Sequence, residues 1–250
     1  MNEAKLNNNH DYMSITTAFS KCYILECNGG YLIIDTGYPK DYKKFVKNLD
    51  EKYRIDVSEI KYLLLTHHHD DHSGFAAELI KNTDLKLIIH EKSIERLKMG
   101  QSEDESEPTN KRIKFVFGFF SRFHEFVFPP VIPRENDIIM KGTEPNKEIL
   151  NNIEINGTII YTPGHTKDGI SVILDDGAVF VGDNAMNAWY FNILGIKKRP
   201  IFLQDINLIF ESWETYIKMG GKKIYPTHGK PFDILKLEKK KKKILNKKIL

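Results

Sequence analysis

The feature that most constrains this fold is a cluster of metal-binding residue types directly after a buried strand. The apolar run 60–65 predicts that strand, and residues 75–80 predict the first turns of a helix. The turn between them carries three imidazoles and one carboxylate: His67, His69, Asp71 and His72. Neutral imidazoles and carboxylates suit zinc, iron and manganese, so residue type alone does not name the metal. One histidine in a polar turn would mean little, but three within six residues predict one side of a metal site.

Three later stretches each pair a predicted strand with one more residue of metal-ligand type. His165 ends a Thr-Pro-Gly-His stretch, Asp183 ends a Val-Gly-Asp stretch, and His228 lies in a Pro-Thr-His-Gly stretch. Earlier in the chain, Asp35 begins an Asp-Thr-Gly turn after the apolar run 31–34. Together with the first cluster, these features resemble the metallo-β-lactamase superfamily in type and order. The resemblance covers roughly residues 20–230.

The resemblance implies an α/β fold, a four-layer αββα sandwich in which two mixed β-sheets pack face to face with helices outside. With 41% hydrophobic and 28% charged residues, the 250-residue chain has the composition of a soluble globular protein. No apolar run reaches the length of a membrane-spanning helix. We expect a single domain over residues 1–235, an aromatic-rich insert at about 100–135, and a lysine-rich tail over 236–250.

Periodicity and turn residues predict the individual elements. Helices are expected at 41–53, 91–99 and 203–219, and strands at 22–27, 30–34, 86–90, 137–141, 149–155, 158–162, 171–174, 178–181 and 222–225.

Carried over residue by residue, the resemblance implies two metal sites that share one bridging carboxylate. The first metal would be held by His67, His69 and His165, and the second by Asp71, His72 and His228. Asp183 would bridge them, so Asp71 and Asp183 are assigned as catalytic carboxylates. Asp35 matches the aspartate that orients a ligand histidine. The implied cofactors are two divalent ions per chain, with zinc favoured and iron or manganese as alternatives.

The implied chemistry is hydrolysis by a hydroxide that bridges the two metals. Two divalent ions carry four positive charges, and Asp71, Asp183 and a hydroxide together carry three negative ones. The net charge of +1 would stabilise negative charge on a substrate oxygen. We therefore expect a metallo-hydrolase that cleaves a small-molecule ester, thioester or lactone. The alternatives are a mononuclear iron persulfide dioxygenase and, among the hydrolases, an acyl-homoserine lactonase.

Departures from the family patterns narrow this choice. β-Lactamases of the superfamily carry a cysteine in the second site or lack the bridging aspartate, whereas this chain keeps Asp183 and has no cysteine after Cys27. Glyoxalase II enzymes have a helical C-terminal region, but only 22 residues follow His228. Acyl-homoserine lactonases place a tyrosine three residues after the bridging aspartate; here that position is Met186, and Tyr190 is out of register. A non-catalytic member is disfavoured, since no ligand is lost.

Two segments fall outside the general pattern. Seven phenylalanines crowd into the insert: Phe115, Phe117, Phe119, Phe120, Phe123, Phe126 and Phe128. Of these, Phe119, Phe123 and Phe126 have the spacing of one helix face. Seven are more than one face can bury, so we favour a lid that holds an apolar part of the substrate, with a homodimer contact and plain core as alternatives.

The tail contains eight lysines and one glutamate, a net charge of +7, which leaves about −4 for the rest of the chain. We favour a solvated helix end docked on the body over a contact with nucleic acid or a membrane. Nucleic acid is therefore an unlikely partner. The N-terminus has no apolar secretory core, and Cys22 and Cys27 suit a reducing compartment, so the expected location is the cytoplasm.

Overall fold

The computed structural model describes residues 12–102, 106–120, 122 and 125–248. Its larger sheet has six strands in the order β1-β2-β3-β4-β5-β7. The first three strands pair antiparallel, and the pairs from β3 to β7 are parallel. The strands are β1 (Met13–Thr16), β2 (Lys21–Cys27), β3 (Gly30–Ile34), β4 (Ile60–Leu64), β5 (Lys86–His90) and β7 (Ile138–Met140).

The second sheet has five strands in the order β13-β12-β10-β9-β8. The pair β10–β12 is parallel, and the other three pairs are antiparallel. Its strands are β8 (Gly157–Tyr161), β9 (Ile170–Leu174), β10 (Ala178–Phe180), β12 (Lys223–Tyr225) and β13 (Phe232–Asp233). The prediction of two mixed β-sheets is confirmed.

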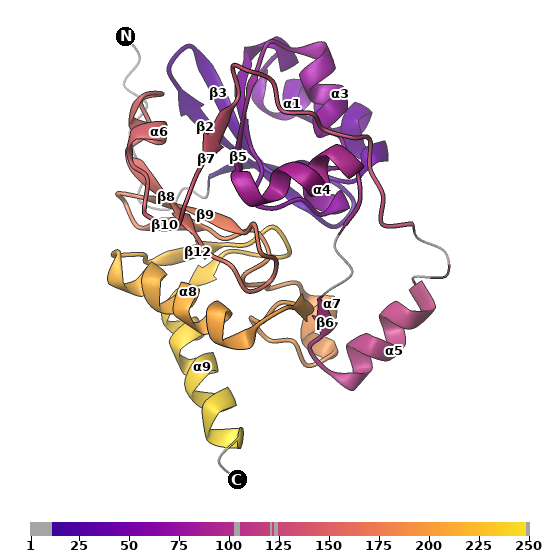
Figure 1. The fold of residues 1–250 in the computed structure, drawn as a ribbon, viewed down its shortest axis with the longest axis vertical. Helices are drawn as coiled ribbons and strands as arrows, with labels where there is room; N and C mark the ends of the chain where they lie inside the picture. Colours follow the sequence, from indigo (N-terminus) through magenta and orange to yellow (C-terminus); the bar gives the residue numbers. More distant parts are fainter. Residues whose placement is uncertain (1–11, 103–105, 121, 123–124, 249–250) are drawn as a thin grey trace.

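Alternation along the strands separates three layers of apolar side chains. Ile24 and Ile33 point outward and pack with residues of the outer helices, whereas Leu25 and Leu32 belong to the cluster between the two sheets. Successive side chains of a strand point to opposite faces, so a strand with helices on one side and a sheet on the other must be apolar throughout. Figure 1 shows the outcome, with helices outside two face-to-face sheets. The predicted αββα sandwich is confirmed.

The outer helices follow their own apolar periodicity. On the first sheet lie α1 (Tyr42–Tyr53), α3 (Ala76–Asn82) and α4 (Ile94–Met99). On the second lies α8 (Ile206–Lys218), which buries Ile209, Trp213 and Tyr216 at helical spacing. The carboxylate of Asp205 begins α8 by accepting a hydrogen bond from the backbone N–H of Asn207 at 2.7 Å.

The last helix, α9 (Leu235–Lys248), runs along α8. Leu237 is fully buried in the same cluster as Trp213, and Lys241 lies 2.5 Å from the carboxylate of Glu214. The lysine-rich segment is thus anchored at its start by apolar packing. None of the helices in the described part of the chain is both long enough and apolar enough to cross a bilayer.

The strand predicted at residues 149–155 is wrong. The chain forms the short helix α6 (Glu148–Asn151) there, followed by a turn in which Glu154 has φ 62°. The side chain of Asn146 accepts a hydrogen bond from the backbone N–H of Ile149 at 3.0 Å and starts the helix. A local cap therefore prevails over the strand preference of the isoleucines, although Ile153 and Ile155 are still buried.

The aromatic insert contains a helix that is shorter than the phenylalanine spacing predicts. Helix α5 (Lys111–Phe120) ends before Phe126, which precedes a single bridge between Val127 and Gln101. Phe126 thus does not continue the predicted helix face, and Phe123 lies outside the described residues. Phe128 is buried in the core beneath α4.

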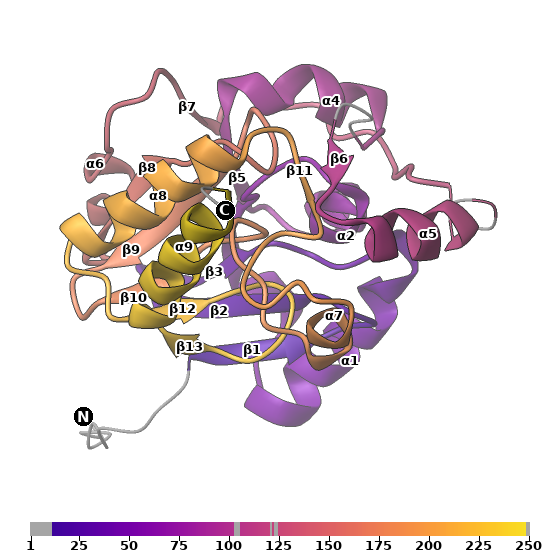
Figure 2. The same cartoon turned by 90° about the horizontal axis from the view of Figure 1, so that it is seen from below.

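The insert joins a second segment to form one side lobe, visible in Figure 2 beside the sheets. The strand β6 (Glu107–Pro108) pairs with β11 (Phe202–Leu203), and a hydrogen bond from Asn110 to Leu194 joins the start of α5 to the end of α7 (Trp189–Ile193). The lobe has its own small core, formed by Ile113, Met186, Ile196 and Ile201. This arrangement places residues 186–203 between α5 and the candidate site.

Candidate metal centre

The first sheet delivers one half of the site from the loop after β4. His67 and His69 lie in this loop, and the helix α2 (Asp70–Ser73) that follows carries Asp71 and His72. Asp35 follows β3, which pairs parallel with β4. Neighbouring parallel strands end at the same edge of a sheet, so Asp35 reaches the histidine loop directly. Its backbone adopts φ 60°, the left-handed region that a short acidic side chain tolerates.

The second sheet delivers the other half. His165 follows β8, Asp183 follows β10 and His228 follows β12. All seven predicted ligands meet at one edge of the sandwich in three overlapping groups, within each of which the ligand atoms lie within 4.8 Å of one another. The groups are His67–His69–His165, His67–His72–Asp183 and Asp71–His72–His228.

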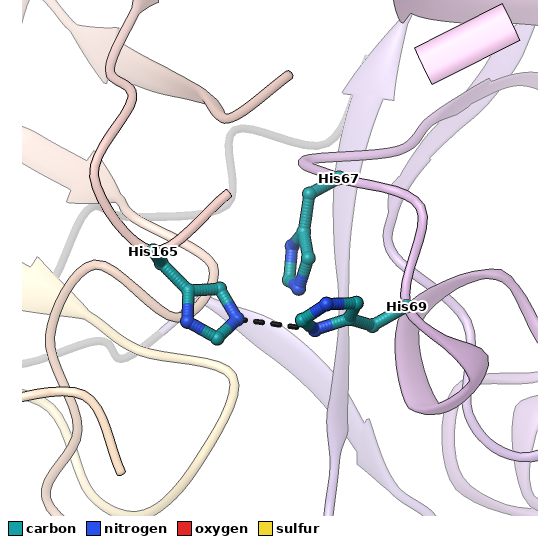
Figure 3. Close-up of side chains that lie close together, drawn as sticks. All are labelled: His67, His69 and His165. Carbon is teal, nitrogen blue, oxygen red and sulfur yellow. Dashed lines mark hydrogen bonds between the residues drawn. The ribbon is translucent and has the colours of Figure 1, made fainter. Parts of the chain in front are cut away.

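The side chains converge on a common volume. Figure 3 shows the imidazoles of His67, His69 and His165 turned toward one another from opposite sides of the site. Nε2 of His165 lies 3.1 Å from Nδ1 of His69. On the other side, Nε2 of His228 lies 3.0 Å from a carboxylate oxygen of Asp71.

Asp183 lies between the group His67–His69–His165 and the group Asp71–His72–His228. Its Oδ2 is 3.6 Å from Nε2 of His165, while its Oδ1 is 3.3 Å from Nε2 of both His72 and His228. One oxygen therefore faces each group. A carboxylate in this position can bind two cations at once.

The polar atoms in this volume fit a metal site. Within the described residues, Nε2 of His67 and Nε2 of His72 are buried and have no hydrogen-bond partner. Leaving such an atom unsatisfied costs about 1–3 kcal/mol, which a coordinated cation would remove. The donor set of imidazoles and carboxylates matches zinc, iron or manganese.

The remote nitrogens of three histidines are fixed by the surrounding backbone and by Asp35. Nδ1 of His72 donates to Asp35 at 2.8 Å, Nδ1 of His165 to the carbonyl of Phe202 at 2.8 Å, and Nδ1 of His228 to the carbonyl of Phe19 at 3.0 Å. With the proton on Nδ1, each Nε2 keeps its lone pair for the site. This is the role expected for Asp35.

Burial and neighbouring charges set the protonation of the cluster. Burial lowers the pKa of His67 and His69 well below the usual value, and neighbouring histidines lower it further. Burial also opposes protonation of His72 and His228, but the nearby carboxylates, Asp71 and Asp183 among them, outweigh it and raise both pKa values well above the usual one. In the metal-free protein, the protons are therefore held by His72 and His228, the two histidines beside Asp71.

These protons give an expected pH dependence. Because the pKa of His72 and of His228 is raised, both hold protons at neutral pH that a metal must displace. Raising the pH removes the competing protons, so the apparent affinity for Zn²⁺ should rise between about pH 6 and pH 8. Competition titration against a chromophoric chelator measures this; an affinity that falls or stays level over that range would contradict it.

The structure also reveals buried polar residues that were not predicted from the sequence as part of the site. His68 and Asp168 form a fully buried pair, with Nδ1 2.9 Å from Oδ1. Burial raises the pKa of Tyr38, and the carboxylates of Asp71, Asp70 and Asp183 raise it further. No spacing in the sequence singles it out, although it lies three residues after Asp35.

Tyr190 also lies within the electrostatic reach of the site. Burial raises its pKa; among the charges acting on it, His228 lowers the pKa, and Asp183 and Asp71 raise it. Asp70, by contrast, accepts a hydrogen bond from the hydroxyl of Ser102 at 3.0 Å and belongs to none of the three groups.

Comparison with known proteins identifies the family of the chain. Residues 15–228 match the sequence family described as the metallo-beta-lactamase superfamily. The chain is 24% identical to a beta-lactamase-like protein 2 homolog of Drosophila melanogaster over 86% of its own length and 60% of the relative's. It is 28% identical to a metallo-beta-lactamase fold-containing protein of Sulfurisphaera tokodaii over 69% of the chain and 62% of that protein. The chain thus spans only about 60% of the length of these relatives.

A solved structure shares the fold. An archaeal metallo-beta-lactamase superfamily protein from Sulfolobus tokodaii superposes with a TM-score of 0.60 at 20% identity, covering 91% of this chain and 80% of that one.

A hydroxyacylglutathione hydrolase of Shewanella loihica is 26% identical over 64% of the chain and 45% of its own length. The superfamily typically comprises hydrolases. This chain, whose family match takes in the whole candidate metal centre, belongs to the metallo-β-lactamase superfamily.

Proposed function

We propose that this protein is a dinuclear metallo-hydrolase that cleaves a small-molecule ester, thioester or lactone. The observation that carries the proposal is the place of Asp183 between two groups of candidate ligands. His67, His69 and His165 would hold one ion, and Asp71, His72 and His228 the other. Zinc is the first candidate, with iron or manganese as alternatives.

When bound, the ions would supply a polarised substrate oxygen and a water of lowered pKa. The chain's own part is to hold the imidazoles and carboxylates in place. Asp35 and the carbonyls of Phe19 and Phe202 fix the ligand histidines from behind. No serine or cysteine nucleophile is required, and Cys22, fully buried beneath the outer helices, could not serve as one.

The substrate is proposed to have an apolar portion. The ring of Phe191 lies 6.0 Å from that of His228, and the ring of Tyr190 lies 6.0 Å from that of Phe19. Phe191 and Tyr190 lie on α7, in the segment that packs on the aromatic insert, whereas Phe19 lies in the loop between β1 and β2. Aromatic walls beside a polar centre are the usual form of a small-molecule pocket.

The domain organisation is part of this proposal. We take residues 1–235 as one domain with the insert at about 100–135, and residues 236–250 as an appended tail. Ile113 of the insert and Ile196 belong to one buried apolar cluster, which supports treating the insert as part of the catalytic unit.

An acyl-homoserine lactonase is a second candidate within the same chemistry. The sequence places Tyr190 out of register for the tyrosine of that family, yet the phenol lies within the electrostatic reach of Asp183 and Asp71. It could therefore donate a hydrogen bond to a lactone carbonyl. Tyr190→Phe should impair lactone turnover more than thioester turnover if this role holds.

A substrate panel tests the proposal. Protein loaded separately with Zn²⁺, Mn²⁺ or Fe²⁺ would be assayed against aryl esters, acyl thioesters and acyl-homoserine lactones of increasing chain length. We expect hydrolysis of at least one class that chelation abolishes and added metal restores. Oxygen consumption with a persulfide, and no hydrolysis by any loaded form, would instead support the dioxygenase.

Chain-length dependence tests the aromatic wall. Phe191→Ser should raise KM for long acyl substrates about tenfold or more and leave short ones little changed, because burial of a phenylalanine-sized apolar surface is worth about 1.5–3 kcal/mol. Phe115→Ser is the matched control, since Phe115 points to solvent. Equal effects of the two variants would remove the wall from the substrate site.

A further inference from the structure

The outer faces of α5 and α7 expose large apolar side chains. Phe115 is 81% exposed and Phe119 63%, while on α7 Trp189 is 72% exposed and Ile193 67%. We call these four residues the aromatic face. Each helix contributes a pair spaced by four residues, which lie next to each other on a helix surface.

Helices α5 and α7 are held together by one apolar cluster and by a hydrogen bond. On α5, Ile113 is fully buried and Phe117 packs against Phe202, on the side opposite to Phe115. The carboxamide of Asn110, just before α5, donates to the carbonyl of Leu194, just after α7, at 3.1 Å. Figures 1 and 2 show both helices on the same side of the molecule, where α5 projects away from the sheets.

The charges on α5 itself are all positive, and the nearest acidic residues in the sequence are Glu107 and Glu125. Residues 109–124 contain four cationic side chains and no acidic one. Lys111, Arg112 and Lys114 are exposed on α5, and Arg122 is exposed just beyond it. A short helix with aromatic residues on its outer face and cations on its flanks has the composition of an interfacial membrane helix.

From this combination we propose that the aromatic face docks on the surface of an anionic lipid bilayer. The rings of Phe115 and Trp189 would enter the boundary between headgroups and acyl chains, and the flanking cations would contact lipid phosphates. The inference does not depend on the proposed function, because it concerns the outer side of the lobe. Its consequence is that the inner side of α7, which carries Phe191, would lie against the candidate centre while the outer side touches lipid.

A second copy of this chain fits the aromatic face less well. Four side chains of this size cover a few hundred Å², whereas a stable dimer buries about 800 Å² on each partner. A two-fold contact would also bring the cations of one α5 against those of the other. An anionic surface removes both difficulties, since lipid supplies the opposite charge and needs no matching shape.

Vesicle binding tests the proposal directly. The 250-residue chain would be mixed with vesicles of phosphatidylcholine alone, or of phosphatidylcholine with about 30 mol% phosphatidylglycerol. We expect binding to the anionic vesicles about tenfold stronger or more, weakened by salt, because each cation near the surface adds to the attraction. The chain has two tryptophans, and Trp213 is buried, so a blue shift of the fluorescence on binding reports on Trp189.

Matched variants distinguish binding through the aromatic face from non-specific binding to vesicles. Phe115→Ser with Phe119→Ser should reduce binding about tenfold or more, whereas Phe115→Leu with Phe119→Leu should keep most of it. Ile217→Ser is the control, because Ile217 is an exposed apolar residue on α8. Trp189→Phe should abolish the fluorescence shift while sedimentation with vesicles persists.

Three outcomes would overturn the proposal. The first is no binding to anionic vesicles by protein with an unchanged circular dichroism spectrum. The second is equal binding of the serine pair and the wild type. The third is a mass in light scattering that is twice the chain mass and that the serine pair halves, which would assign the aromatic face to a second copy of the chain.

Discussion

Replacing Asp183 with alanine should lower kcat/KM by about three orders of magnitude or more and empty at least one metal site. Its two carboxylate oxygens face different groups, with Oδ2 toward His165 and Oδ1 toward His72 and His228. Without this carboxylate, two cations a few ångströms apart would repel each other with no shared anion between them. The loss of even one ion would remove several kcal/mol of transition-state stabilisation.

Asp70→Ala is the matched control for this variant. Asp70 is also a buried aspartate near the candidate centre, at the start of α2 beside Asp71, but it accepts a hydrogen bond from Ser102 and belongs to none of the candidate ligand groups. It should keep both ions and most of the activity. Metal content by elemental analysis and kcat/KM on the best substrate decide the comparison. Similar losses in the two variants would show that the bridge is wrongly assigned.

Asp35→Asn should weaken metal binding about 10–100-fold and lower the melting temperature. The Asp35 carboxylate is fully buried and accepts four hydrogen bonds: Oδ1 from the backbone N–H of Thr66, and Oδ2 from the side chains of Thr66, Thr227 and His72. An amide keeps the volume but turns an NH₂ group toward donors in either orientation. His72 would lose the partner that keeps its Nε2 available to a metal.

Thr227→Val provides the graded comparison, because it removes only one of those four bonds. It should lower stability by about 1 kcal/mol and leave metal affinity within a few-fold of the wild type. Chelator competition and thermal melts of metal-free and loaded protein measure both quantities. Metal affinity unchanged in Asp35→Asn would mean that His72 is oriented by other contacts.

Much of this architecture could be predicted from the sequence because local pattern and global fold agree. In β3, the alternation of Leu32 and Ile33 between two different cores follows from a strand buried on both faces. The candidate ligands could be found because each directly follows a strand, and strand ends meet at one edge. His165 and His228 are distant in sequence, so their approach to His67 was predicted by the family resemblance and not by spacing.

Other features had no adequate local signal. The short helix α6 begins at a hydrogen bond from the backbone N–H of Ile149 to the side chain of Asn146, which competes with the strand preference of the isoleucines. The pairing of His68 with Asp168 joins residues 100 positions apart, and no sequence pattern around either residue predicts it. Tyr38 lies in the loop after β3 and Tyr190 on the short helix α7, and the positions of both depend on tertiary packing rather than on propensity.

The count of metal ions per chain tests the central claim most directly. Protein purified without added metal, then dialysed against limiting and saturating Zn²⁺, Mn²⁺ or Fe²⁺, would be measured by elemental analysis against protein concentration. The convergence of seven candidate ligands, with Asp183 shared between two groups, leads us to expect two equivalents at saturation. Binding that stops at one equivalent, or that survives the loss of Asp183 unchanged, would contradict the dinuclear centre.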